Sequence, residues 1–251
     1  MKDNKEPRHE VEIGVSIKKE FDPTSWKPRT ELGRLVKDGK FNSLDGVFNT
    51  GHRIMESEII DQMAKNLSSE FLEIGQSKGK FGGGKASVWK QTQKKTAEGN
   101  KPKFQTAIVV GNNDGFVGVG VGKAKETVPA REKALRNAKL NMIKIKRGCG
   151  SWDCHCRTQH SIPFSVQGKC GSIRILLSPA PKGSGLVAED GTQKILRAAG
   201  IKDIYSKLEG TTASKLNVAT ACFNALKQLT KIKISGGQEK MLGVNDGKES
   251  E

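Results

Sequence analysis

Valine and glycine alternate strictly from Val117 to Gly122, and this pattern restricts the possible fold more than any other segment. In a β-strand the side chains point alternately to opposite faces, so the valines share one face and Gly118, Gly120 and Gly122 leave the other face bare. Glycine weakens a strand interior, and it often marks a place where a ligand or another backbone approaches closely. The sequence therefore predicts a strand whose bare face lies against a bound ligand or against the backbone of another segment.

Positive charge is concentrated around this strand. The 251 residues carry a formal net charge of +16, and residues 74–148 alone contain 17 basic and 4 acidic side chains. Such an excess indicates a polyanionic partner. Nucleic acid is favoured over a membrane surface, because no basic helix carries Trp, Phe and Leu together on its opposite face. A solvated surface without a partner is the alternative. The glycine face is accordingly a candidate for contact with RNA.

Residues 93–103 are interpreted as a basic loop between two strands, with lysines gathered at its tip. Lysine can contact phosphates wherever a nucleic-acid backbone passes, whereas a tip that only keeps the hairpin soluble is the alternative. Other basic side chains are expected to extend the same surface. The predicted RNA-binding residues are Lys90, Lys94, Lys95, Lys101, Lys103, Gly118, Gly120, Gly122, Lys123, Lys125, Arg131, Arg136, Lys144, Lys146 and Arg147.

The first half of the chain is predicted to form an α+β domain over residues 31–148, after an N-terminal tail at 1–30. Apolar residues three or four apart predict a helix from about Met55 to Ile74. Glycine and lysine over 78–86 predict a flexible insertion. The elements expected after this insertion are strands at 88–95, 104–110 and 116–122 and a helix from about Thr127.

A second, small α/β domain is predicted over residues 162–232. Its expected elements are strands at 162–166 and 172–177, a helix at 192–199, a strand at 203–206 and a helix at 214–230. The tail at 233–251 is rich in glycine and acidic residues, and it is predicted to be disordered.

A cysteine-rich connector at 149–161 separates the two predicted domains. Cys149, Cys154, Cys156 and His160 supply the Cys3His set of a closed, structural zinc site. Free thiols are the alternative, since a reducing compartment disfavours disulfides. His155 lies inside the cluster and is a second candidate for the nitrogen ligand.

Glycine-rich segments also occur in nucleotide-binding loops, but the required motifs are absent. A Walker loop has four residues between its glycines and then Gly-Lys followed by Ser or Thr, whereas three residues separate Gly118 from Gly122 and Ala124 follows Lys123. The glycines also lie within a strand rather than at a strand-to-helix turn, which excludes a dinucleotide fingerprint. No catalytic set can be assembled from the spacing of the residues, so the chain is not expected to be an enzyme.

Several longer segments resemble the small-subunit ribosomal protein five family, in its archaeal and eukaryotic type. The resemblance covers roughly residues 26 to 230. It rests on Phe104-Gln-Thr-Ala-Ile-Val-Val-Gly-Asn-Asn-Asp-Gly-Phe-Val-Gly-Val-Gly-Val-Gly, Arg147-Gly-Cys-Gly-Ser-Trp, His160-Ser-Ile-Pro-Phe, Gly168-Lys-Cys-Gly-Ser and Pro179-Ala-Pro-Lys-Gly-Ser-Gly-Leu-Val. The insertion at 78–86 and the acidic C-terminal tail depart from the family pattern.

This resemblance implies a fold and a function. The implied fold is α+β, with a double-stranded-RNA-binding-like α-β-β-β-α domain followed by a small α/β domain that contains a left-handed β-α-β crossover. The implied function is that of a structural constituent of the small ribosomal subunit. It would bind ribosomal RNA at the junction of head and body, neighbour small-subunit proteins four and eight, and line the channel through which messenger RNA enters. Lys94, Lys95, Lys101 and Lys103 match the family's basic region linked to decoding fidelity and messenger unwinding.

Two other functions are compatible with parts of the sequence. A free-standing regulatory protein that binds double-stranded RNA would have the same charge distribution. A kinase activity of the second domain would use the loop at 179–186, although the serine pair that such kinases place after the glycines is missing.

We expect a cytoplasmic, ribosome-bound chain without homo-oligomers. Residues 1–12 lack an apolar core of signal length, and no run approaches the roughly 18 apolar residues of a membrane span.

Overall fold

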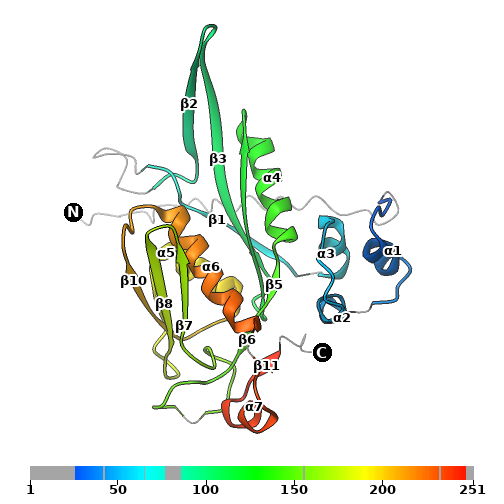
Figure 1. Ribbon diagram of the computed structural model, residues 1–251, viewed down its shortest axis with the longest axis vertical. Helices are drawn as coiled ribbons and strands as arrows, with labels where there is room; N and C mark the ends of the chain where they lie inside the picture. Colours follow the sequence, from blue (N-terminus) through cyan, green and yellow to red (C-terminus); the bar gives the residue numbers. More distant parts are fainter. Residues whose placement is uncertain are drawn as a thin grey trace, which may run out of the picture.

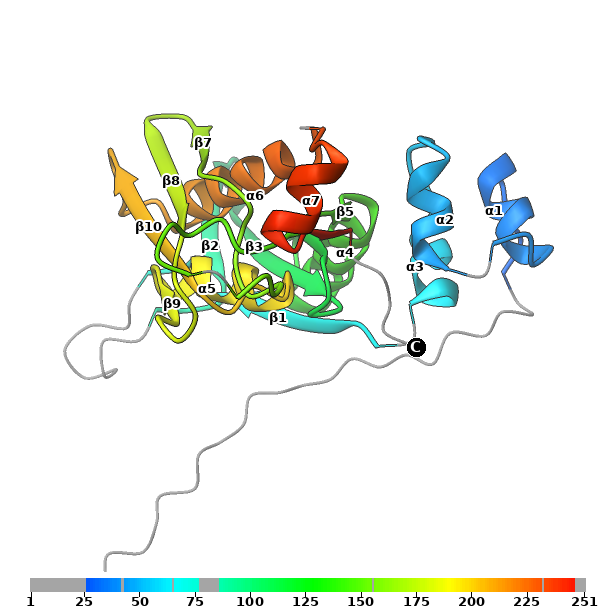
Figure 2. The same ribbon diagram turned by 90° about the horizontal axis from the view of Figure 1, so that it is seen from below.

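The computed structural model describes residues 26–41, 43–64, 66–76, 86–154, 156–231 and 233–246. Its elements form two large sheets and one two-stranded sheet, with helices between and beside the large sheets (Figures 1 and 2). No helix within these ranges is long and apolar enough to cross a membrane. The predicted insertion at 78–86 lies almost wholly outside the described residues, as do residues 1–25 of the predicted N-terminal tail.

Three short helices begin the described chain: α1 (Glu31–Lys37), α2 (Leu44–Asn49) and α3 (Ser57–Met63). The carboxylate of Glu56 holds the start of α1, because it accepts hydrogen bonds from the Trp26 indole at 3.0 Å and from the amides of Arg29 and Thr30 at 2.8 and 2.7 Å. Residues 26–30 are therefore anchored to the protein, and the predicted tail is too long at its C-terminal end.

The predicted helix from Met55 to Ile74 is wrong in its second half. The helix α3 ends at Met63, and strand β1 (Ser68–Leu72) follows it. β1 pairs antiparallel with β3, and the side chains of Phe71 and Leu72 reach two different core clusters on opposite faces of the sheet. The apolar residues near Phe71 fit both the periodicity of a helix and that of a strand, and pairing with the distant strand β3 decides in favour of a strand.

The first sheet consists of β1, β2 (Lys90–Thr96), β3 (Gly99–Gly111), β4 (Phe116–Ala124) and β5 (Ile143–Lys144). Its order is β1-β3-β4-β5, and β2 pairs with the first part of β3. The three predicted strands are confirmed, but the predicted loop at 93–103 is wrong. Those residues continue the two strands into a long hairpin whose turn lies at Ala97 and Glu98. In Figure 1 this hairpin projects beyond the rest of the molecule.

The bare face of β4 lies against helix α4 (Thr127–Leu140). A Cβ atom added to Gly118 would overlap with the carbonyl oxygen of Ala138, and one on Gly120 would lie 2.7 Å from the Cα atom of Ala138. Gly122 meets Ala130 and Ala134 in the same way. The assignment of Gly118, Gly120 and Gly122 to RNA binding is therefore wrong. The approaching backbone is that of α4, as the alternative interpretation predicted.

The second sheet contains β7 (Val166–Cys170), β8 (Ile173–Pro179), β10 (Ile204–Glu209) and β9 (Leu186–Val187), in that order. β9 and β10 are parallel neighbours, and α5 (Asp190–Ala198) connects them. Helix α6 (Lys215–Lys231) follows β10. The strand predicted at 162–166 is wrong except for Val166, because β7 runs from Val166 to Cys170. The other predicted elements of this half are present, and β10 extends three residues further than predicted.

Helices α5 and α6 lie between the two sheets and share one core with both. Buried residues of β3 and β4, including Val109, Val117 and Val119, belong to the same cluster as Ile195 of α5 and Leu226 of α6. A second cluster lies on the other face of the first sheet, where α4 and the three N-terminal helices pack. The two predicted domains are therefore joined by a continuous hydrophobic core.

The end of the described chain is folded. Helix α7 (Gly236–Leu242) terminates at Gly243, whose φ of 56° is the left-handed conformation typical of a helix end. Strand β11 (Asn245–Asp246) then pairs with β6 (Lys146–Arg147). The predicted disorder of 233–251 is thus wrong for this part, because backbone pairing with β6 orders a segment with few apolar residues.

Candidate nucleic-acid interface and metal centre

The β2–β3 hairpin carries lysines on one face. Directly paired residues of an antiparallel ladder point to the same side, and Lys94 pairs with Lys101 while Thr92 pairs with Lys103. The same alternation places Lys90 on this side, and the pairing of Gln105 with Lys123 of β4 extends the row. We call Lys90, Lys94, Lys101, Lys103 and Lys123 the lysine face, and all five side chains are exposed. Lys95 points to the opposite side.

Electrostatic repulsion opposes this arrangement. Like charges placed directly opposite each other destabilise a strand pair, and Lys94 lies opposite Lys101. The salt bridge of 2.6 Å between Lys101 and Glu98 compensates little, since both side chains are more than half exposed. The lysine face therefore favours a polyanion that would neutralise it.

The other predicted RNA-binding residues divide into exposed and internally bound side chains. Lys125 and Arg136 are exposed. The guanidinium of Arg131 lies 4.7 Å from the ring centroid of Trp89 and 5.3 Å from that of Phe71, a cation–π contact that joins α4 to the sheet. Lys144 forms a 2.8 Å salt bridge with Asp45, and Lys146 is partly buried in β6. We assign Arg131 and Lys144 to the packing of the protein.

Arg147 is not an RNA-binding residue, and its prediction as one is corrected. Its side chain is 6% exposed and forms a salt bridge with Asp114 in the β3–β4 turn. It also donates to the Gly200 carbonyl at 3.3 Å and to Gln159 Oε1 at 3.2 Å. These partners belong to the first half, the second half and the connector, so Arg147 ties all three together.

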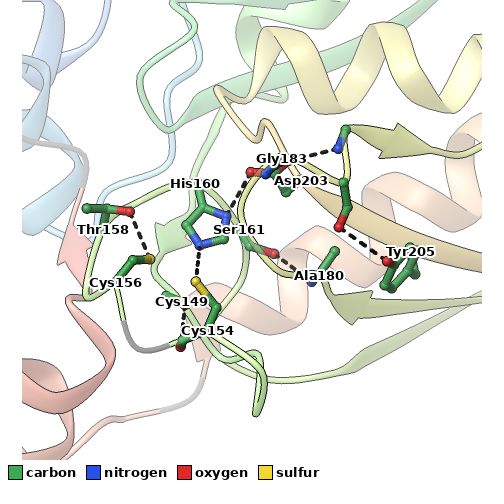
Figure 3. A network of polar contacts seen from close by, with 12 residues as sticks. Cys149, Cys154, Cys156, Thr158, His160, Ser161, Ala180, Gly183, Asp203 and Tyr205 are labelled. Atoms are coloured by element: carbon green, nitrogen blue, oxygen red, sulfur yellow. Dashed lines mark hydrogen bonds and ion pairs between the residues drawn. The ribbon is translucent and has the colours of Figure 1, made fainter.

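The connector folds so that its four predicted ligands meet. Ser161 forms a bridge to Gly148, which brings His160 back beside Cys149. The sulfur atoms of Cys149, Cys154 and Cys156 and a ring nitrogen of His160 all lie within 4.8 Å of one another (Figure 3). In tetrahedral zinc sites, bond lengths of about 2.0 to 2.3 Å separate the ligand atoms by about 3.5 to 3.8 Å. The described cluster is close to this size and could hold a metal ion.

The environment of the cluster favours a thiolate. Burial opposes ionisation of Cys156, but hydrogen bonds from Thr158 and from the other two thiols outweigh it and lower the pKa of Cys156 to about 6. Burial and hydrogen bonds with Cys156 and Cys154 raise the pKa of Cys149 to about 11. Ionisation is thus favoured at Cys156, and a divalent cation would be needed to ionise Cys149 at neutral pH.

Sequence reasoning missed one residue next to this cluster. Asp203 Oδ2 lies 2.9 Å from His160 Nδ1, and both side chains are buried. Asp203 is separated from His160 by β7, β8, β9 and α5, so no local pattern indicates the contact. The second candidate nitrogen ligand, His155, lies outside the described residues.

Residues 74–146 match the family described as "Ribosomal protein S5, N-terminal domain", and residues 168–236 match "Ribosomal protein S5, C-terminal domain". The chain belongs to the ribosomal protein S5 family. This confirms the family resemblance, and it agrees with the expectation that the chain is not an enzyme. The lysine face lies within the first matched range, whereas the metal cluster lies between the two ranges.

Relatives of the S5 family extend the similarity over most of the chain. A protein of Nanoarchaeum equitans named "Small ribosomal subunit protein uS5" is 46% identical over 222 residues, which are 88% of this chain and 95% of the relative. The protein of the same name from Methanothermobacter thermautotrophicus is 45% identical over 89% of this chain and 97% of its own length. The protein of the same name from Thermofilum pendens is 47% identical over 81% of this chain and 93% of its own length.

Proposed function

We propose that this chain is a structural constituent of the small subunit of cytoplasmic ribosomes and binds ribosomal RNA there. Three relatives named as small ribosomal subunit proteins match more than four fifths of the chain. The observation that carries the RNA-binding part is the lysine face of the projecting hairpin, where five exposed lysines from three strands share one side of a sheet. Glu98 pairs with Lys101 at the exposed tip, but no acidic residue stands between the lysines on the strands themselves, so the face suits a phosphate backbone.

We further propose the finer role that the family resemblance implies. In this role the chain lies at the junction of head and body beside small-subunit proteins four and eight. Its hairpin contacts messenger RNA at the channel through which the messenger enters, and contributes to decoding fidelity and unwinding. The projection of the hairpin beyond the body of the protein supports this assignment, since a protruding two-stranded ribbon can reach an RNA strand that the core of the protein does not touch.

The same proposal covers the finer description of the fold. A first half of double-stranded-RNA-binding type is supported by the packing of α4 on an antiparallel sheet. A left-handed β-α-β crossover in the second half is supported by the parallel neighbours β9 and β10 with α5 between them.

Sedimentation of a cell lysate tests the ribosomal assignment. We expect the chain to co-sediment with small subunits, and to remain with them at salt concentrations that remove loosely bound RNA-binding proteins. A free-standing binder of double-stranded RNA would instead be found mainly at the top of the gradient, and would bind isolated duplexes with little dependence on sequence. Recovery of most of the protein in that free fraction would refute the proposal.

We also propose that Cys149, Cys154, Cys156 and His160 bind one structural zinc ion. Three thiols and one imidazole form a closed ligand set without an open position for substrate, which is typical of structural zinc. Such an ion would stabilise a connector that holds few apolar side chains of its own.

Elemental analysis tests the zinc proposal. Purified protein that has never met a chelator is expected to contain about one zinc ion per chain, and the Cys154→Ser variant is expected to lose it because one of four ligands is removed. Cys170→Ser is the matched control, since Cys170 is a free, partly buried cysteine of β7 outside the cluster. Metal-free wild-type protein, or full retention of zinc by Cys154→Ser, would contradict the proposal.

A further inference from the structure

Asp203 contacts two different parts of the protein with its two carboxylate oxygens. Oδ2 lies 2.9 Å from Nδ1 of His160. Oδ1 accepts hydrogen bonds from the amides of Gly183 and Gly185, at 3.0 and 2.8 Å (Figure 3). The residue itself is 5% exposed. A buried carboxylate therefore connects a predicted metal ligand with the loop that leads into β9.

The backbone aligns this pair. The carbonyl oxygen of His160 accepts hydrogen bonds from the amides of Lys202 and Asp203, at 2.9 and 3.0 Å. Nδ1 lies within ion-pair distance of the Asp203 carboxylate, and the other ring nitrogen, Nε2, lies 3.9 Å from Sγ of Cys154. A carboxylate at Nδ1 stabilises the tautomer that carries its proton there, which leaves a lone pair on Nε2 for a metal.

The loop at 181–185 depends on the same carboxylate. Gly183 and Gly185 have φ values of 94° and 70°, and an added Cβ atom on either would meet nothing within 4 Å. Few side chains therefore hold the loop by packing. Besides the two bonds to Asp203, three hydrogen bonds hold the loop. The Ser184 amide donates to the Pro181 carbonyl at 3.2 Å, and the Ile204 amide donates to the Gly185 carbonyl at 3.1 Å. The Tyr205 hydroxyl contacts the Ser184 hydroxyl at 3.2 Å.

We propose that Asp203 is a positioning residue of the metal centre, and that metal binding in the connector orders the loop at 181–185 through the His160–Asp203 pair. This inference rests on the zinc proposal. The metal fixes His160, the imidazole fixes the carboxylate of Asp203, and the carboxylate holds the amides of Gly183 and Gly185. Without the metal, His160 can rotate, so the carboxylate loses its fixed partner.

The first experiment measures hydrogen exchange of the full-length wild-type chain by mass spectrometry, with zinc bound and after removal of zinc by a chelator. Exchange of the amides in a peptide covering 181–187 is expected to become at least about tenfold faster without zinc, because opening of the loop then lacks one restraint. Exchange of residues 104–124 in β3 and β4 is expected to stay the same, since their amides bond across the β3–β4 ladder rather than to Asp203. Unchanged exchange of the loop would overturn the inference.

The second experiment measures zinc affinity by competition with a chromophoric chelator. In Asp203→Asn the side-chain amide would place a donor opposite Nδ1 and favour the wrong tautomer of His160, so affinity is expected to fall about 10-fold to 100-fold, with one zinc still bound at saturation. Asp153→Asn removes the same charge from an exposed position beside Cys154 and is expected to keep wild-type affinity. Affinity of Asp203→Asn within twofold of the wild type would refute the role of Asp203.

The two experiments separate this inference from the zinc proposal. The zinc content of the wild-type chain tests the metal site alone, and a wild-type chain that binds no zinc refutes both. A chain that binds one zinc without any response of the loop refutes only the coupling. If Asp203→Asn fails to fold, which the exchange of residues 104–124 would reveal, the wild-type comparison with and without zinc still decides whether the coupling exists.

Discussion

The Gly120→Ala variant is expected to lose more than about 3 kcal/mol of folding free energy, which is the largest stability effect that we predict for a single methyl group in this protein. A Cβ atom at this position would overlap with the backbone of α4 at Ala134 and Ala138. Backbone atoms cannot rotate away as a side chain can, so the helix would have to move off the sheet. Both residues of α4 are fully buried in the core cluster on this face, and that contact would open.

Urea unfolding followed by circular dichroism measures this effect. Gly237→Ala is the matched control, because it adds the same methyl group in α7 where nothing lies within 4 Å. This control is expected to be neutral or slightly stabilising, since alanine favours a helix over glycine by roughly 0.5 to 1 kcal/mol. If the free energy of unfolding of Gly120→Ala lies within about 1 kcal/mol of the wild-type value, α4 does not pack on the glycine face.

Reversal of charge on the lysine face is expected to have the largest effect on RNA binding. The triple variant Lys90→Glu, Lys94→Glu and Lys103→Glu removes three phosphate-binding charges from one side of the hairpin. Each lysine that contacts a phosphate contributes about one unit to the slope of log affinity against log salt concentration. The slope of binding to ribosomal RNA fragments should therefore fall by about three. The affinity should fall by on the order of 100-fold or more at low salt.

A comparison of neighbouring residues tests the orientation of the face. Lys94→Glu and Lys95→Glu make the same charge change on adjacent residues of β2 that point to opposite sides. Lys94→Glu is expected to weaken RNA binding more than Lys95→Glu does.

In assembled subunits we expect the triple variant to alter decoding accuracy or messenger unwinding more than it alters subunit assembly. An equal loss of assembly would show that these lysines are structural contacts, and an unchanged salt slope would exclude the face from RNA binding.

Local patterns predicted most of the regular structure. Alternation in Val117–Gly122 predicted β4, and the helix predicted from about Thr127 is α4. These predictions succeed because residues of a strand or helix that share a face are neighbours in sequence. The pattern of cysteines and histidine in the connector likewise predicted all four ligands of the candidate metal site, since they lie within a segment of twelve residues.

Predictions failed where a distant segment decides the outcome. Residues 68–72 form a strand because β3 offers a backbone partner, although their apolar spacing also suits a helix. The C-terminal segment is ordered by pairing of Asn245 and Asp246 with β6. Arg147 and Asp203 are polar residues whose partners lie in other parts of the chain, and nothing in their own surroundings in sequence indicates that they are buried.

The sequence alone determined that one face of the strand at Val117–Gly122 is bare, that basic charge surrounds it, and that the chain resembles a ribosomal protein family. Only the tertiary structure decided what the bare face contacts. It is filled by the backbone of α4, because the absence of side chains allows the helix to approach the strand closely. The proposed contact with RNA therefore belongs to the lysine face and not to the glycines. The direction of each lysine depends on strand register, which is a property of paired strands rather than of one segment.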